Sequence, residues 1–366
     1  MTRFSGGSRP SKNNRQGPSE GCERPESHIE PSDLLGDTGL RPLSVEPDRK
    51  LRDEAAHELS EGPQARPWYA VLESWRQWMR DYRGMHIEYE KEGETARTRL
   101  ENSYQPRYGK RYYAKLKDFE RGVSRRWSDV TTAMLTFTAS TENASGRPRC
   151  PADHMRDIAE GWGTARKQLH QVLSGTNWEY CRVWEPHESG YGHLHVAVFV
   201  EAGDMPAERF RPVMESHVGE CRPAGTEAHT VENAVSVNDD VENIGSYISE
   251  YIGCFGEDPT ERGIHEQMFY AVTWATGTRR VDFSNGAHSV IAGEQFRRET
   301  GLKPEQRGEV GTSTSGAESD EGEEWEVNSI CKVRRGTPDY HDPTTGGASM
   351  TVIDGRPGMD PPAEVD

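Results

Sequence analysis

The sequence lacks the patterns that mark several common classes of protein. Its 366 residues contain only six cysteines and no Cys-x-x-Cys pair, which argues against a zinc ribbon or a disulfide-built scaffold. No run of 18 apolar residues occurs, and the N-terminal MTRFSGGSRPSKNNRQGPSEG has no apolar core of a secretory signal. No phosphate-binding loop of the GxxxxGK[ST] type occurs either, so a nucleotide-driven motor is not indicated. We therefore expect a cytoplasmic protein without a membrane partner.

Lysine is also scarce, although the chain is highly charged. Only 9 of the 44 basic residues are lysine, and the formal net charge is −17. An acidic, lysine-poor chain of this kind resembles the proteins of salt-loving archaea. A negative charge normally argues against nucleic-acid binding, because phosphate contacts need cations. At molar salt, however, the Debye length falls to about 3 Å, so local contacts matter more than net charge.

Composition divides the chain into four regions. Residues 1–66 and 301–366 are rich in Gly, Pro, Ser and charge, and we expect both to be mostly disordered, the second as an acidic tail. Residues 67–127 are expected to be helical, because PWYAVLESWRQWMRDY repeats apolar residues at helical spacing. Residues 128–300 are expected to form the main domain.

The end of the helical region has an unusual local charge. Residues 97–126 contain ten Lys or Arg and three acids, with tyrosines interleaved. This composition suits phosphate contacts and base stacking. It suits equally well a solvated helix whose Leu116, Phe119 and Val123 pack inward, and both interpretations stay open.

The region 128–300 is predicted to be an α+β domain. The segments 132–140, 178–185, 193–200 and 229–237 are typical of strands, and 151–173 has one apolar helical face. The loop PHESGYG separates the second and third of these strands and predicts a hairpin. RRVDFSNG (279–286) is interpreted as either a further strand and turn or a strand with DNA contacts at Arg279 and Arg280.

Two histidines stand out within GYGHLHVAVFV (190–200). In a strand, His193 and His195 point to the same face while Leu194 points to the other. Two imidazoles on one face can bind one cation, although a His-x-His pair on a solvated strand face has no need of a metal.

Two tyrosines follow on a predicted helix, NDDVENIGSYISEYIG (238–253). Tyr247 and Tyr251 are four residues apart and lie side by side next to an apolar stripe. Beside a divalent cation that polarises a phosphodiester, a phenolic oxygen can attack phosphorus. A packed aromatic pair is the structural alternative.

The ordered set of motifs resembles the HUH endonuclease superfamily, in which U is a bulky apolar residue. Within it, the chain resembles the two-tyrosine rolling-circle replication initiators of haloarchaeal plasmids and pleomorphic viruses. LTFTAS (135–140) is similar to the first motif, GHLHVAVFV to the metal-binding motif and SYISEYI to the two-tyrosine motif. The resemblance covers roughly residues 130–285. Glu250 replaces the lysine often found between the tyrosines, which leaves that lysine's role unassigned.

The resemblance implies a central antiparallel sheet of the HUH/RRM-like type, with the histidines on a strand and the two-tyrosine helix packed against the sheet. It also implies site-specific nicking and joining of single-stranded or cruciform origin DNA through a 5′-phosphotyrosine, with a host helicase and polymerase as further partners. The metal ligands would be His193, His195 and a third residue. Glu185 is the favoured third ligand, with His187 and Glu188 as rivals, and a carboxylate suits Mg²⁺ or Mn²⁺.

Other functions remain open. An HUH transposase usually has one tyrosine and a relaxase usually has three histidines, so the sequence favours an initiator over both. A cupin-type barrel also uses His-x-His, but its glutamate is expected three or four intervening residues after the second histidine. Glu201 follows five intervening residues and misses that window. A DNA-binding protein without catalysis is the last alternative.

Overall fold

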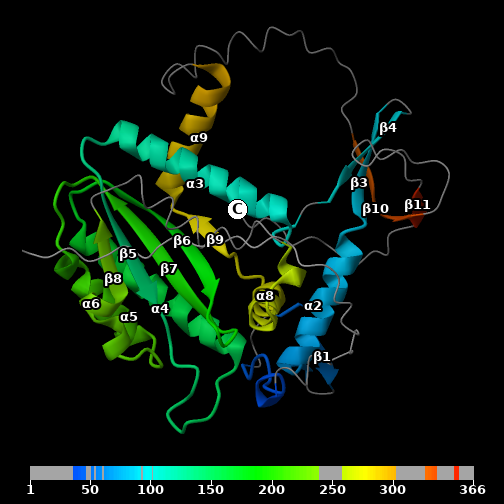
Figure 1. Ribbon diagram of the computed structural model, residues 1–366, viewed down its shortest axis with the longest axis horizontal. Helices are drawn as coiled ribbons and strands as arrows, with labels where there is room; N and C mark the ends of the chain where they lie inside the picture. Colours follow the sequence, from blue (N-terminus) through cyan, green and yellow to red (C-terminus); the bar gives the residue numbers. More distant parts are fainter. Residues whose placement is uncertain are drawn as a thin grey trace, which may run out of the picture.

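The computed structural model of the chain is shown in Figure 1. It describes residues 36–46, 51–52, 55–59, 62–91, 94–100, 102–238, 258–301, 326–335 and 350–353. Within these ranges, no helix combines the length and the apolarity needed to cross a bilayer.

A five-stranded antiparallel sheet forms the centre of the fold (Figure 1). Its strand order is β8-β5-β7-β6-β9. The strands are β5 (Thr131–Phe137), β6 (Trp178–Pro186), β7 (Gly192–Val200), β8 (Val235–Asn238) and β9 (Val281–Phe283). The sheet and its helices confirm the predicted α+β class. The predicted strand 229–237 is wrong in its first half, where η4 (Glu227–His229) and α6 (Val231–Ala234) precede β8.

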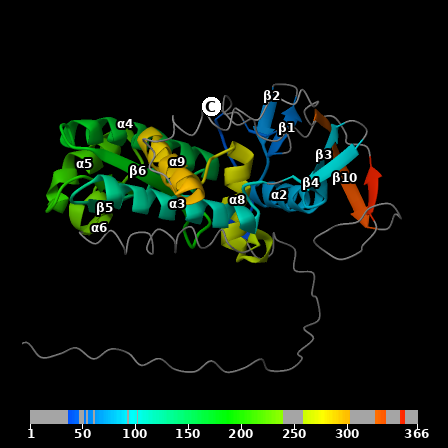
Figure 2. The same ribbon diagram turned by 90° about the horizontal axis from the view of Figure 1, so that it is seen from above.

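The strand register divides the sheet into two faces. Phe137 pairs with Leu194, and Phe137 and Tyr180 both contact Trp162 of α4 (Pro151–Val172), with ring centroids 5.5 and 5.3 Å apart. Residues of the opposite parity face α3 (Pro106–Arg126), where Phe119 lies 4.7 Å from the Phe199 ring. The helices α3 and α4 therefore cover opposite faces of the sheet, as Figures 1 and 2 show.

Further helices complete these two layers. On the first face, α5 (Arg211–Glu220) packs against α4, and η3 (Ala207–Phe210) leads into it. On the second face, α9 (Asn285–Thr300) packs against α3. The contact between α3 and α9 includes an ion pair between Asp118 and Arg298, with a closest distance of 2.9 Å.

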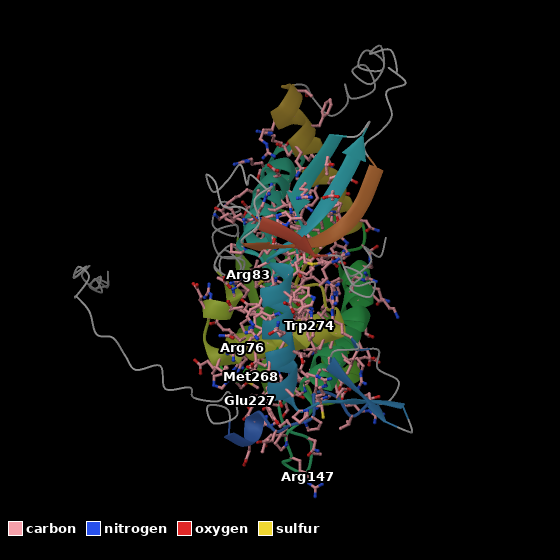
Figure 3. All side chains as sticks on the ribbon, turned by 90° about the vertical axis from the view of Figure 1, so that its right-hand side faces the viewer. Arg76, Arg83, Arg147, Glu227, Met268 and Trp274 are labelled. Atoms are coloured by element: carbon pink, nitrogen blue, oxygen red, sulfur yellow. The ribbon has the colours of Figure 1, made fainter. Side chains whose placement is uncertain are left out.

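The helix predicted from PWYAVLESWRQWMRDY is α2 (Trp68–Tyr82), and it packs against α8 (Ile264–Thr276), which follows η6 (Pro259–Glu261). The Trp68 indole donates a hydrogen bond to the Met268 carbonyl. Arg76 donates to Gln267 on α8. Figure 3 shows Arg76 on α2 and Arg83 at the end of that helix, with Met268 and Trp274 of α8 beside it. Residues 191 and 200 positions apart in the sequence thus lie in contact.

A second, four-stranded antiparallel sheet has the order β11-β10-β3-β4. Its strands are β3 (Met85–Lys91), β4 (Glu94–Arg99), β10 (Glu326–Arg335) and β11 (Met350–Ile353). The region expected to be helical thus contains a hairpin, and two strands fall in the region expected to be mostly disordered. MHIEYEK alternates apolar and polar residues, which is the strand period, whereas β10 depends on a partner strand about 240 residues upstream.

The N-terminal region also differs from the expected disorder within its described part. It contains η1 (Gly36–Thr38) and the hairpin of β1 (Ala56–Leu59) and β2 (Gly62–Ala65). The backbone of Leu43 receives a hydrogen bond from Ala152 on α4, and the Leu43 side chain is fully buried. Contacts with the main domain therefore position this segment, and its own composition gave no sign of them.

Candidate metal centre

The hairpin of β6 and β7 brings the predicted metal ligands together. In its register Glu185 pairs with His193 and Val183 pairs with His195, so Glu185, His193 and His195 all lie on the face of the sheet that α3 covers. The connecting loop is closed by a hydrogen bond from the His187 N–H to the Tyr191 carbonyl. Gly190 has φ +83° in this loop, a conformation that favours glycine.

The three side chains meet at one point. The Glu185 Oε2 atom lies 3.1 Å from His193 Nε2 and 2.9 Å from His195 Nε2. One ligand atom from each residue lies within 4.8 Å of the others. Two ligands bound to one Mg²⁺ at about 2.1 Å are at most about 4.2 Å apart, so small side-chain shifts would let the three residues bind one ion.

The electrostatics of Glu185 and His195 also suit a cation. Burial disfavours ionisation of Glu185, but the hydrogen bonds from His193 and His195 outweigh it and hold the pKa of the carboxyl at about 2. Burial lowers the pKa of His195, although the Glu185 carboxylate opposes that shift. An ionised carboxylate and a neutral imidazole at pH 7 are the forms that bind a metal. The three residues could therefore hold a divalent metal ion.

A fourth residue orients one of the ligands. The Thr136 Oγ1 atom lies 3.1 Å from His195 Nδ1, and Thr136 pairs with His195 across β5 and β7. This contact holds the ring so that its Nε2 atom points to Glu185. Hydrogen bonds of this kind fix the tautomer and the direction of a metal-binding histidine. Thr136 lies within the LTFTAS motif, but its role depends on a register that the sequence did not give.

The alternative ligands considered from the sequence lie outside this cluster. The His187 ring centroid is 6.3 Å from that of His193, and its Nδ1 atom is within hydrogen-bond distance of Ser189. Glu188 lies in the loop after β6. The glutamate that a cupin-type site would use, Glu201, follows the far end of β7 and accepts a hydrogen bond from Asn177. Among the described residues, Glu185 is the one carboxylate in the cluster with both histidines.

The predicted nucleophiles are not among these contacts. Tyr247, Tyr251 and Glu250 lie outside the described residues, which end at Asn238 on β8 and resume at Asp258. Asn238 pairs with Thr132 on β5, so β8 is the edge strand next to the one that carries Thr136. The roles of both tyrosines stay predictions.

The basic, aromatic stretch forms α3, and the DNA contact suggested by its charge stays a prediction. Leu116, Phe119 and Val123 are fully buried against the sheet and α9, as the packing interpretation predicts. The opposite side is exposed and basic, with the exposed residues Arg107, Lys110, Arg111, Arg121, Arg125 and Arg126. Arg121 pairs with Asp118, and Arg125 pairs with Glu294.

Of the two interpretations of RRVDFSNG, the structure favours the strand and turn, because Arg280 is buried just before β9. Its side chain is only 3% exposed, and its guanidinium lies 4.4 Å from the Tyr104 ring centroid and 5.1 Å from that of Tyr270. It also donates to the Ser103 carbonyl. Arg280 therefore joins the turn before α3 to α8 as a buried cation among aromatic rings. Arg279 is exposed and pairs with Asp282 at 3.3 Å.

Sequence reasoning also missed three buried histidines. His154 lies within hydrogen-bond distance of the Gly192 carbonyl, and burial lowers its pKa to about 4. His217 contacts the Thr138 carbonyl, and His229 accepts from the Thr138 N–H. These contacts fasten the end of β5 and the start of β7 to the helices. They come from scattered positions, so no local pattern marks them.

The comparisons with known proteins show which family this chain is in. Two relatives from haloarchaea are each called "Uncharacterized 36 kDa protein". The relative from Halobacterium salinarum is 38% identical over 263 residues, covering 67% of this chain and 83% of its own. The relative from Halobacterium sp. (strain GN101) is 35% identical over 263 residues, covering 65% and 80%. No solved structure matches the chain. The model of one protein family matches residues 44–330, and the chain belongs to that family, which is described as "Putative rep protein (DUF1424)".

Proposed function

We propose that this protein initiates rolling-circle replication by nicking and rejoining single-stranded or cruciform origin DNA at an HUH-type site. The observation that carries the proposal is the cluster of Glu185, His193 and His195 on two adjacent strands. The family description, which names a Rep protein, supports a role in replication. The resemblance to two-tyrosine initiators supports the reaction type.

In the proposed reaction, Tyr247 or Tyr251 attacks a phosphodiester. The phenolic oxygen forms a bond to phosphorus, the bond from phosphorus to the 3′ oxygen breaks, and the phenolic proton passes to solvent or to the leaving oxygen. The products are a 5′-phosphotyrosine and a free 3′-hydroxyl, which a host polymerase would extend while a host helicase unwinds the duplex. The second tyrosine or the hydroxyl then reverses the step, and no nucleotide hydrolysis is needed because a phosphodiester replaces a phosphodiester.

The residues of the site have separate tasks in this reaction. A divalent cation held by Glu185, His193 and His195 would supply Lewis-acid polarisation of a non-bridging phosphate oxygen. Thr136 keeps His195 in the orientation that binding requires. The site lies on a rigid hairpin rather than on loops, and such placement keeps reacting groups in register.

The test is the covalent adduct. The full-length protein is mixed with overlapping single-stranded oligonucleotides from its own replicon, Mn²⁺ and high KCl, and denaturing gels are run with the variants Tyr247→Phe, Tyr251→Phe, the double variant and His193→Ala. We expect a metal-dependent adduct that the double variant and His193→Ala lose. His187→Ala, a nearby histidine outside the cluster, is the matched control and should keep the adduct.

A second candidate is a metal-dependent DNA-binding protein without catalysis, which the exposed basic side of α3 would also serve. Tight Mn²⁺ and DNA binding with no adduct on any fragment would favour it and refute nicking. An adduct lost completely in one single-tyrosine variant and unchanged in the other would identify the tyrosine that attacks first.

A further inference from the structure

A hollow lies at the opposite end of β6 from the metal ligands. It consists of two adjoining cavities, of about 420 and 310 Å³, which share Trp178, Glu179 and Gly286. Both volumes are in the range of small-molecule sites, roughly 300–1,000 Å³. The hollow is formed where β9 has ended and α9 begins, so three elements that are distant in sequence meet there.

Two arginines lie on opposite sides of the hollow. Arg126, in the last turn of α3, lines one cavity, and Arg166, on α4, lines the other. Both side chains are exposed. Because α3 and α4 cover opposite faces of the sheet, two cations from different layers flank one opening.

The aromatic centre of the hollow is Trp178. Its ring is half-buried, with the His170 ring at 4.8 Å and the Tyr180 ring at 6.2 Å in a nearly parallel arrangement. Trp127 adds a second indole to the wall on the α3 side. A partly open indole between cations can stack a flat ring on its face.

The one acid in this hollow, Glu179, does not cancel the two arginines. Its carboxylate accepts hydrogen bonds from the Ser284 hydroxyl and, at 3.2 Å, from the Ala287 N–H in the first turn of α9. It therefore acts as a cap for α9, where the helix dipole stabilises negative charge. The charge left facing the opening is that of Arg126 and Arg166.

We propose that this hollow binds one nucleotide of single-stranded DNA, with the base stacked on Trp178 and the phosphates next to it on Arg126 and Arg166. Aromatic stacking combined with a positively charged groove is the usual way to bind single strands without sequence preference. The inference extends the proposed function, since it assumes that the substrate of the metal centre is single-stranded DNA. Trp178 and Glu185 are seven residues apart on one strand, about 23 Å, so the hollow is a site separate from the reaction centre.

The test measures binding apart from catalysis. The affinity of the full-length protein for a fluorescent single-stranded oligonucleotide and for its duplex is measured in EDTA over a range of KCl concentrations. Trp178→Ala should weaken single-strand binding by roughly 5- to 150-fold, the effect of losing one stacked base, and should leave duplex binding nearly unchanged. The double variant Arg126→Gln, Arg166→Gln should reduce the slope of log affinity against log salt concentration by the amount expected for about two phosphate contacts.

Arg147 supplies the matched control. It is exposed in the loop between β5 and α4, at the lower end of the view in Figure 3, and Arg147→Gln should change neither quantity. The two arginine substitutions lie on the surface and keep the test valid if Trp178→Ala folds poorly. Photocrosslinking of an iodouracil oligonucleotide, mapped by mass spectrometry, should identify Trp178 directly.

The outcomes separate this inference from the proposed nicking reaction. If the Trp178 and double-arginine variants bind single strands as the unsubstituted protein does, the hollow is not a DNA site, whether or not an adduct forms. Equal losses for single strand and duplex would also refute the stacking. If the losses are specific to single strands and no adduct is ever seen, the hollow is supported and the nicking reaction fails.

Discussion

Replacing Thr136 with valine tests the metal centre without removing any ligand. Valine has nearly the shape of threonine but no hydroxyl, so the change deletes the 3.1 Å contact to His195 Nδ1 and little else. When Nε2 binds a metal, the ring proton is on Nδ1 and needs an acceptor, which the Thr136 oxygen supplies. His195 is only 9% exposed, so water replaces that acceptor poorly.

The expected magnitude follows from the loss of such a supporting contact. Removing the partner of a metal-binding histidine typically costs 10- to 100-fold in metal affinity, about 1.4–2.7 kcal/mol. The orphaned nitrogen also lowers the free energy of unfolding by about 1–3 kcal/mol. We expect both effects, with Mn²⁺ affinity measured by calorimetry and stability by urea unfolding.

The matched control is Thr132→Val. Thr132 is on the same strand and the same sheet face, four residues from Thr136, and it is 1% exposed. It should affect stability but not Mn²⁺ affinity. If Thr136→Val lowers stability while Mn²⁺ binds as tightly as before, Thr136 has a packing role only and the proposed orientation of His195 is refuted.

Two further predictions concern the core behind the site. A Cβ atom on Gly161 of α4 would lie 2.4 Å from His217 Nδ1, whereas one on Gly163 meets nothing within 4 Å. Gly161→Ala should therefore lower the free energy of unfolding in urea by about 1–3 kcal/mol. Gly163→Ala should raise it by about 0.5–1 kcal/mol. Equal effects of the two would contradict the tight packing. Burial lowers the pKa of His217 to about 4 from its usual 6.5, so the unfolded chain takes up this proton first as the pH falls, and stability should drop by about 2 kcal/mol between pH 7.5 and pH 5. Unfolding curves in constant KCl measure this, and a His217→Gln variant with the same pH dependence would show that other groups cause it.

The part of the site that follows from the alternation of side chains along one strand could be predicted from the sequence. A strand puts residues i and i+2 on one face, which is sufficient to pair His193 with His195. Glu185 required one further assumption, that the seven residues between the two strands form a hairpin in a particular register. The structure has that register, with Glu185 opposite His193.

Contacts that depend on distant partners were not predictable. The sequence left open whether Arg280 contacts DNA or belongs to a plain strand and turn, because Tyr104 and Tyr270, which enclose it, come from a turn before α3 and from α8. The strand β10 was interpreted from its acidic surroundings as part of a tail, because its partner β3 precedes it by about 240 residues. The amino-acid composition of a segment gives its average residue content and carries no information about a partner strand elsewhere in the chain.

The arrangement of β6 gives the two proposed sites a fixed relation. Glu185 and Trp178 are on one strand in the middle of a hydrogen-bonded sheet, so the distance between them is set by strand geometry, about 23 Å, and not by a loop. The odd separation of seven residues also places the two side chains on opposite faces of the sheet, Trp178 on the face that α4 covers and Glu185 on the face that α3 covers. The hollow and the metal ligands are therefore separated both along the strand and across the sheet. The acidic net charge does not oppose this arrangement, because in molar salt only the cations that touch the DNA strand, such as Arg126 and Arg166, contribute to binding.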